Sequence, residues 1–276
     1  MSPPIAAIDL GSNSFHMIVA EPHNGYFKVL DRMREVVRLA AGLDTDNRLT
    51  DSAMERALDC INRFGERVRH LPGASVRAVG TNALRRARNA ASFIRKAEAA
   101  LGHSIDVVSG IEEARLIYLG VSHGLAEAIG SRLVMDIGGG STELIIGQRF
   151  EPIAMESLHM GCVSMTERHF GDGRIDAKRL RAAEIAAGQE FEPIEETFRA
   201  RGWQSAIGAS GTLLAIAETL SAQGWSADGI TVAGLRKLRQ ALIDLGSSDA
   251  LTELKIRDDR RPVFAGGFAI ALGAFE

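Results

Sequence analysis

The chain has 276 residues, of which 46% are hydrophobic and 24% are charged, and its formal net charge is −3. A chain of this length can bury two ordinary domain cores without disulfides or a structural metal. The near-neutral charge argues against wholesale nucleic-acid binding but allows a local basic pocket that faces an anionic ligand. Cys60 and Cys162 lack metal-ligand spacing, so we expect two unpaired thiols in a reducing compartment.

The N-terminal residues do not predict a secretion signal, because two prolines lead directly into the apolar stretch 5–10 without a basic region. The most apolar segment, residues 263–275, is too short to cross a bilayer about 30 Å thick. We therefore expect a cytoplasmic protein without a membrane span.

The first part of the chain predicts a meander of strands followed by alternating helices and strands. Strands are indicated over 6–10, 15–21 and 26–40, with turn signals at 11–14 and 23–25. From Thr50, a plausible cap together with Asp51, apolar residues recur at helical spacing. A strand over 75–80, a helix over 84–101, a strand over 105–109 and a helix over 112–125 follow.

The second part repeats this order. Three strands are predicted over 132–137, 142–148 and 151–160, then helices over 162–170 and 177–200, a strand over 205–210, and helices over 213–222, 232–245 and 264–275. The alternation of helices with single strands implies parallel pairing with helices on the sheet faces. We expect one domain over 1–125 and a second over 126–276.

An internal repeat supports this division. Residues 7–20 align with residues 135–147 when Asp9 is set on Asp136, and an apolar strand follows the matched turn in both copies. The fold class predicted is therefore α/β, with two copies of one unit facing each other across a cleft. The matched pairs are Asp9 and Asp136, Gly11 and Gly138, and Ser14 and Ser141.

Each copy places an aspartate at the end of an apolar strand, followed by a turn of small residues. Such turns expose backbone N–H groups that can close on phosphate oxygens. The alternative is a plain hairpin turn, which favours the same residues. Ser210, Gly211 and Thr212 form a third candidate loop, for which an ordinary helix N-cap is the stronger alternative.

Carboxylates near these loops suggest a metal and a base. Mg²⁺ prefers one or two carboxylates and takes its other ligands from water and substrate phosphates, and Asp136 with Glu143 supplies such a pair. Alternatively, Glu143 faces solvent on an exposed strand. Ser109 and Glu112 match a capping box, which leaves Glu113 as the candidate base for an attacking water, or as a carboxylate that only favours the helix dipole.

Among the basic residues after Asn82, Arg85 lies nearest the strand-to-helix junction and is our candidate for a phosphate contact. The remaining arginines and lysines of this stretch are expected on a solvated helix face. The histidines are scattered without paired spacing, and we assign none of them a role.

The segments AIDLGSNSFHMIVAE, VGTNALRRARNA, SGIEEARLIYLGVSH, DIGGGSTELIIG, LHMGCV and AIGASGT resemble, in order, motifs of the exopolyphosphatase and guanosine pentaphosphate phosphohydrolase family. The resemblance runs from about residue 5 to the end. It implies the duplicated ribonuclease H-like fold of the actin, sugar kinase and Hsp70 superfamily, with an interdomain cleft.

The resemblance also implies roles and a reaction. Glu113 would activate the water, and Asp136 with Glu143 would bind Mg²⁺ or another divalent cation. The implied reaction is removal of the terminal phosphate from inorganic polyphosphate. The implied phosphate-binding residues are Asp9, Gly11, Asn13, Ser14, Arg85, Gly138, Gly139, Gly140, Ser141, Ser210, Gly211 and Thr212.

Three alternatives stay open. The nearest is hydrolysis of guanosine pentaphosphate by the same carboxylates. A kinase or ATPase of the same superfamily would use the glycines of AGGFA at 265–269, although close helix packing explains them more simply. A non-catalytic sensor of polyphosphate or of an alarmone is the third. Long family members continue into a helical region, so this sequence is expected to be a short form or part of a longer chain, and a homodimer is left open.

Overall fold

The computed structural model describes residues 3–23, 26–125 and 130–276. The chain forms two compact units, unit 1 over Met1–Ser109 and unit 2 over Gly110–Glu276. The sequence prediction placed the division after residue 125, beside residues 126–129, which lie outside the described part. The difference concerns one helix, α4 (Gly110–Gly124), which packs against the strands of unit 2.

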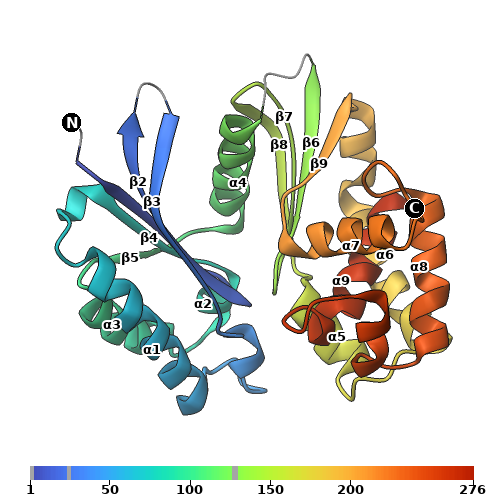
Figure 1. Ribbon diagram of the computed structural model, residues 1–276, viewed down its shortest axis with the longest axis horizontal. Helices are drawn as coiled ribbons and strands as arrows, with labels where there is room; N and C mark the ends of the chain where they lie inside the picture. Colours follow the sequence, from blue (N-terminus) through green and yellow to red (C-terminus); the bar gives the residue numbers. More distant parts are fainter. Residues whose placement is uncertain (1–2, 24–25, 126–129) are drawn as a thin grey trace. The chain divides into compact units, whose positions relative to one another are not determined.

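Unit 1 is built on a five-stranded sheet in the order β3-β2-β1-β4-β5. The strands β1, β2 and β3 form the predicted antiparallel meander, and β4 and β5 extend the sheet in parallel. Helices α1 and α3 contact each other along this sheet (Figure 1). The bounds are β1 (Ile5–Leu10), β2 (Ser14–His23), β3 (Tyr26–Val36), α1 (Asp51–Val68), β4 (Val76–Gly80), α2 (Asn82–Arg86), α3 (Ala90–Leu101) and β5 (Ile105–Val107).

The helix predicted over 84–101 is interrupted, because Asn89 pairs with the main chain of a distant loop. Its Oδ1 accepts the N–H of Leu49 at 2.8 Å, and its Nδ2 donates to the carbonyl of Leu49 at 2.9 Å. The N–H of Arg88 also donates to the carbonyl of Asn47 at 2.8 Å. These tertiary contacts replace helical hydrogen bonds between α2 and α3.

Residues 24 and 25 of the turn predicted over 23–25 lie outside the described part of the chain.

Unit 2 repeats the architecture with a four-stranded sheet in the order β8-β7-β6-β9. Asp136 lies opposite Glu143 on the first two strands, as Asp9 lies opposite His16 in unit 1. The duplicated α/β fold is therefore confirmed. The bounds are β6 (Ser131–Ile137), β7 (Thr142–Gln148), β8 (Glu151–Leu158), α5 (Cys162–Phe170), α6 (Ala177–Arg201), β9 (Ser205–Gly208), α7 (Gly211–Ala222), α8 (Val232–Leu245) and α9 (Arg261–Phe275).

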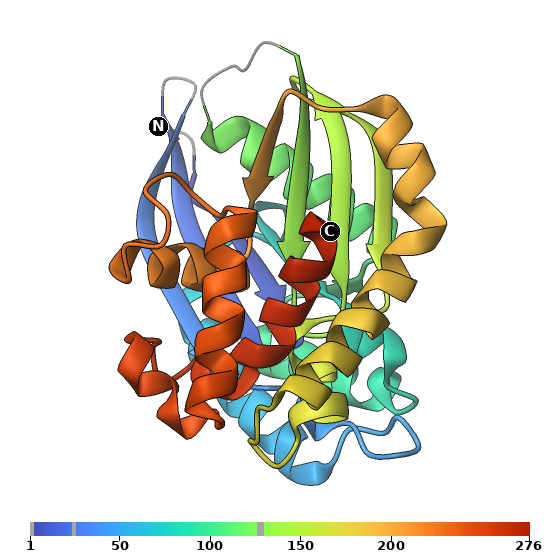
Figure 2. The same ribbon diagram turned by 90° about the vertical axis from the view of Figure 1, so that its right-hand side faces the viewer.

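Helix α9 is the central helix of the layer opposite α4. It contacts α5, α6, α7 and α8, and Figure 2 shows it running between them. A Cβ on Gly266 would lie 2.6 Å from the N atom of Thr166, and one on Gly267 would lie 2.4 Å from Cγ2 of Thr212. These contacts agree with the packing interpretation of the AGGFA glycines. No helix in the described ranges has the length and apolar character needed to cross a membrane.

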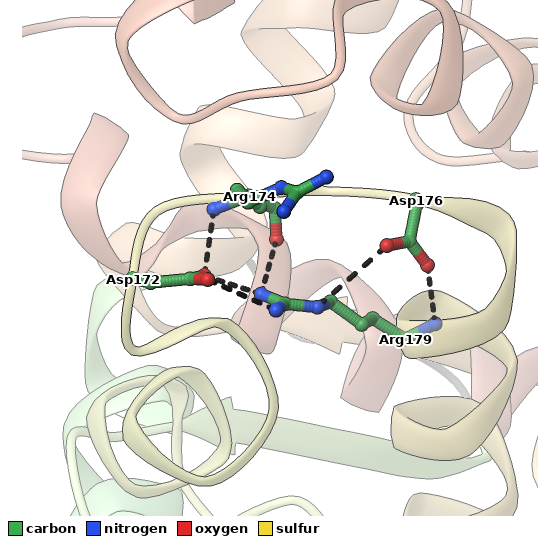
Figure 3. A network of polar contacts seen from close by, with 4 residues as sticks. All are labelled: Asp172, Arg174, Asp176 and Arg179. Carbon is green, nitrogen blue, oxygen red and sulfur yellow. Dashed lines mark hydrogen bonds and ion pairs between the residues drawn. The ribbon is translucent and has the colours of Figure 1, made fainter.

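An ion-pair network fixes the connection between α5 and α6 (Figure 3). Asp176 caps α6 by accepting the N–H of Arg179 at 2.9 Å. The Arg179 guanidinium binds the carboxylate of Asp172 and donates to the carbonyl of Arg174 at 3.3 Å. The pKa of Asp172 is lowered to about 2, chiefly by hydrogen bonds from Arg179. The network is exposed and lies on a connecting loop, so we assign it a structural role.

Candidate active site

The α4 side of the unit 2 sheet carries both an apolar cluster and a group of carboxylates. Val134 and Ile145 pack there against Ala114 and Tyr118 of α4. Because side chains alternate along a strand, Asp136 shares the face of Val134, and Glu143 shares the face of Ile145. Strand alternation therefore places two carboxylates beyond the end of an apolar core, facing the helix that carries Glu113.

The electrostatics show that these three carboxylates interact. Loss of hydration raises the pKa of Asp136 well above its ordinary value, and the charge of Glu113 raises it further. The pKa of Glu143 is raised by burial, then by Glu113 and Asp136. Like charges that crowd in this way disfavour one another, so the group is well suited to a cation.

Glu143 is almost completely enclosed, with 1% of its surface exposed. This excludes the alternative of a solvent-facing strand residue. Its Oε1 accepts a hydrogen bond from Oγ of Ser157 at 2.8 Å, and the side chain of Ser141 also hydrogen-bonds to it. Both bonds lower the pKa of Glu143, but they do not outweigh burial and the neighbouring carboxylates.

The two adjacent glutamates at the start of α4 have different environments. Glu112 forms a bidentate ion pair with Arg115, with distances of 2.8 and 2.7 Å. Glu113 instead acts electrostatically on Asp136 and Glu143. Glu113, beside the candidate cation site, is placed to accept a proton from water. Glu112 is less suited to this role, because its carboxylate is paired with Arg115 on the outer face of α4.

The loop at 138–141 is held by the N-terminus of α5. The N–H of Cys162 donates to the carbonyl of Gly138 at 2.8 Å, and the N–H of Val163 donates to the carbonyl of Gly139 at 2.9 Å. In a trans peptide the N–H points opposite to the C=O of the same plane, and the described chain has no cis peptide. The N–H groups of Gly139 and Gly140 therefore point away from α5 and can bind an anion.

Gly161 permits this arrangement, because the loop lies directly against its Cα. A Cβ there would be 2.4 Å from the C atom of Gly139 and 2.4 Å from the N atom of Gly140. Both are backbone atoms, so a larger residue would have to displace the loop itself. The absence of a side chain at Gly161 thus sets the position of the candidate anion-binding N–H groups.

The loop at 210–212 begins α7 and is partly engaged in capping. Oγ of Ser210 accepts the N–H of Leu213 at 3.2 Å, and Oγ1 of Thr212 donates to the carbonyl of Ile137 at 3.0 Å. The single hydroxyl proton of Thr212 is therefore used within the fold, while that of Ser210 has no acceptor among the described residues and could be donated to a ligand. The N-cap alternative is therefore correct for Ser210, and phosphate binding by this loop stays a prediction.

Arg260 lies beside the same loop and was not singled out in the sequence. A Cβ on Gly211 would be 2.2 Å from its Nη2 atom, so the guanidinium covers the first residue of α7. The N-terminus of a helix carries a partial positive charge, so a cation beside it is unfavourable. An anion bound there would be stabilised both by the helix dipole and by the guanidinium. The only signal in the sequence was the charged run at 257–261, which has no distinctive spacing.

In unit 1, the loop at 11–14 is buried and fixed by neighbouring main chain. The carbonyl of Asn13 accepts the N–H groups of Val37 and Arg38 at 3.0 and 2.8 Å. Oδ1 of Asn13 is buried without a hydrogen-bond partner in the described part of the chain. This oxygen can therefore accept a hydrogen bond from a ligand. A Cβ on Gly11 would lie 2.8 Å from the carbonyl oxygen of Ser14.

Two arginines approach this part of unit 1. Arg34 donates from Nη2 to Oγ of Ser14 at 3.4 Å. Arg85, the predicted phosphate contact, donates from Nη1 to the carbonyl of Val108 at 2.9 Å and is partly buried. Asp9 is at the end of β1, opposite His16. The unit 1 candidates thus lie near the ends of β1 and β4.

The unit 2 residues fit a hard divalent cation. Within the described ranges, no group of three or more histidine, cysteine, aspartate or glutamate side chains is arranged to hold a metal alone. Asp136 and Glu143 nevertheless provide two oxygen donors in a site that lacks charge compensation. Mg²⁺ is commonly held by one or two carboxylates, with substrate phosphates and water as the other ligands.

The sequence pattern of the Ppx/GppA phosphatase family matches residues 18–276. The chain belongs to the Ppx/GppA phosphatase family. Solved structures agree with this assignment. An exopolyphosphatase from Cytophaga hutchinsonii is 25% identical, with a TM-score of 0.84, and the match covers 99% of this chain and 88% of that one. The Aquifex aeolicus PPX-GPPA enzyme, at 23% identity and a TM-score of 0.78 over 98% and 91% of the two chains, shows the fold.

Closer relatives carry a different name. A guanosine-5'-triphosphate,3'-diphosphate pyrophosphatase from Aeromonas hydrophila is 45% identical over 275 residues, and one from Vibrio cholerae is 47% identical over 279 residues. Each match covers 100% of this chain and 55% of the relative. The chain therefore spans about half the length of these Ppx/GppA relatives.

These relatives overturn the polyphosphate reading of the sequence. Exopolyphosphatase activity was the main prediction, and guanosine pentaphosphate hydrolysis was its alternative; the relatives support the alternative. The prediction was wrong for a physical reason. The loops and carboxylates were chosen as candidates for binding phosphate, metal and water, which both substrates would require, and no motif was chosen for a nucleoside.

Proposed function

We propose that this Ppx/GppA chain, alone or within a longer protein, hydrolyses the terminal 5′ phosphoanhydride of guanosine pentaphosphate. The observation that carries the proposal is identity of 45–47%, across the whole chain, to relatives named for guanosine-5'-triphosphate,3'-diphosphate. The carboxylate group of unit 2 supports a hydrolytic role, because it combines a candidate cation site with a nearby base.

The proposed reaction is attack of water on the terminal phosphorus. Glu113 accepts a proton from the water, the new P–O bond forms, and the bond to the bridging oxygen breaks. Orthophosphate and guanosine tetraphosphate are the products. The backbone N–H groups of Gly139 and Gly140 would bind phosphate oxygens, and Ser210 would donate its hydroxyl. Ser141 would have to turn its single hydroxyl proton from Glu143 to the phosphate.

A divalent cation, when bound, would neutralise charge on the phosphates. Asp136 and Glu143 are the residues that would hold it, and Mg²⁺ is the ion that the oxygen donors favour. We also assign phosphate binding to the unit 1 residues Asp9, Gly11, Asn13, Ser14 and Arg85, and to Gly138, Gly211 and Thr212 of unit 2.

The test is a comparison of substrates with the same preparation. The chain is incubated with Mg²⁺ and either guanosine pentaphosphate, short polyphosphate or long polyphosphate, and the products are resolved by ³¹P NMR and anion-exchange chromatography. We expect orthophosphate and guanosine tetraphosphate, formed faster than orthophosphate from either polymer. Faster release from polyphosphate, or release of pyrophosphate from the nucleotide, would contradict the proposal.

A further inference from the structure

Ser157 is the residue on which we base a further inference. It lies on β8 directly opposite Glu143 on β7, so the two side chains point to the same face of the sheet. Its hydroxyl donates to Oε1 of Glu143 at 2.8 Å. No motif in the sequence marked this serine.

The environment of Glu143 makes this hydrogen bond important for stabilising its carboxylate. The side chain is 1% exposed, so water offers it little solvation. The charged groups that shift its pKa are Glu113 and Asp136, and both are negative. The hydrogen bonds to its carboxylate come from hydroxyls of Ser157 and Ser141. A bound cation would require the ionised carboxylate, and a hydrogen bond to an ionised, desolvated acceptor is stronger than one between neutral groups.

The two serines differ in what holds them. Ser141 belongs to the loop that we assign to phosphate binding, so the substrate would compete with Glu143 for its hydroxyl. Ser157 lies within a strand that is paired along its length with β7. A donor on a strand holds its direction more firmly than a donor on a loop.

We propose that Ser157 is a positioning residue that orients the Glu143 carboxylate for a divalent cation. By engaging Oε1, it fixes the rotation of the carboxylate and leaves the remaining lone pairs for the metal. The inference rests on the proposed cation site and deepens it. Partners of this kind behind metal ligands typically change metal affinity by about 10- to 100-fold when they are removed.

The test measures binding of Mn²⁺ alone, by electron paramagnetic resonance of the free ion, with the full chain and without substrate. We expect Ser157→Ala to weaken Mn²⁺ binding by about 10- to 100-fold and Ser157→Thr to restore it, because threonine keeps the hydroxyl. Ser122→Ala is the matched control. It removes a buried hydroxyl of α4 that has no hydrogen-bond partner among the described residues.

The outcomes separate this inference from the proposed function. Equal Mn²⁺ affinity in Ser157→Ala and wild type would overturn the role of Ser157 while the cation site stands. Equal weakening in Ser157→Ala and Ser157→Thr would overturn it too, because the hydroxyl would not be the cause. A wild-type chain that binds no Mn²⁺ would overturn both the cation site and the inference. A lower melting temperature alone, with unchanged affinity, would show a merely structural role.

Discussion

Asp136 and Glu143 are direct cross-strand partners on β6 and β7, and both project to the face of the sheet that α4 covers. The corresponding pair in unit 1 is Asp9 and His16. The duplication has thus preserved the aspartate in both units, whereas only unit 2 places a second carboxylate opposite it. A site that concentrates negative charge in one unit leads to the following predictions.

Replacing Glu113 by glutamine should remove the proposed base while keeping the shape of the side chain. We expect turnover of guanosine pentaphosphate to fall by about 10²- to 10⁴-fold. Mn²⁺ binding should persist, since Asp136 and Glu143 remain. Steady-state kinetics and metal titration measure the two effects.

The adjacent Glu112→Gln is the control for Glu113→Gln. Glu112 is ion-paired with Arg115 on the surface of α4, so its loss should cost about 0.5 kcal/mol of stability or less and leave turnover unchanged. Equal activity in Glu113→Gln and wild type would remove Glu113 from the mechanism.

Replacing Glu143 by glutamine should separate stability from cation binding. Removal of one buried charge relieves repulsion with Glu113 and Asp136, so the melting temperature without divalent cations should rise. The additional rise on adding Mg²⁺ should be lost. Thermal denaturation with and without Mg²⁺ measures both, and Glu151→Gln, an exposed residue of β8, serves as control. A variant that Mg²⁺ stabilises as strongly as wild type would argue against the assignment of Glu143.

The raised carboxyl pKa values predict how stability depends on pH. In the folded chain the pKa of Asp136 is raised to about 7, and that of Glu143 is raised as well. Between the unfolded pKa, about 4, and these folded values, the folded chain binds more protons than the unfolded chain. This contribution to stability is therefore fully present below about pH 4 and is lost as the pH rises through about 7.

Urea denaturation in EDTA, between about pH 5 and pH 8, checks this dependence. We expect the free energy of unfolding of wild type to decrease as the pH rises, and that of Glu143→Gln to decrease less. Saturating Mg²⁺ should reduce the slope for wild type, because the cation favours the ionised carboxylates. Identical slopes for wild type and Glu143→Gln in EDTA would show that these carboxyls are not linked to folding.

Replacing Gly161 by alanine should disturb the anion-binding loop. The new Cβ would meet backbone atoms of Gly139 and Gly140, so we expect a loss of stability of about 1–3 kcal/mol and weaker substrate binding. The control is Gly188→Ala in α6, where a Cβ would meet nothing within 4 Å. Alanine in a helix interior should stabilise the chain by about 0.5–1 kcal/mol. Urea denaturation and the KM for guanosine pentaphosphate measure the effects; an unperturbed Gly161→Ala would contradict the packing argument.

Much of the fold was predictable, because hydrophobic period and glycine punctuation are local properties. The helix over 162–170 was predicted with the bounds that α5 has, and the repeat predicted that each unit opens with a meander of three strands. The break at Asn89 was not predictable, since it depends on hydrogen bonds to Leu49, which lies forty residues away in the chain. The affiliation of α4 with unit 2 likewise follows from packing on β6, β7 and β8.

For the candidate site, the residue types that follow each strand can be read from the sequence, including two glycine loops, a carboxylate pair and Glu113 beside Glu112. The enclosure of Glu143, the hydrogen bond from Ser157 and the position of Arg260 against Gly211 become visible in the tertiary structure alone. Burial, cross-strand pairing and the approach of a distant arginine all depend on contacts between segments far apart in the chain. The local sequence pattern indicates which secondary structure and which side chains each segment provides. Tertiary packing brings particular side chains of different segments into contact.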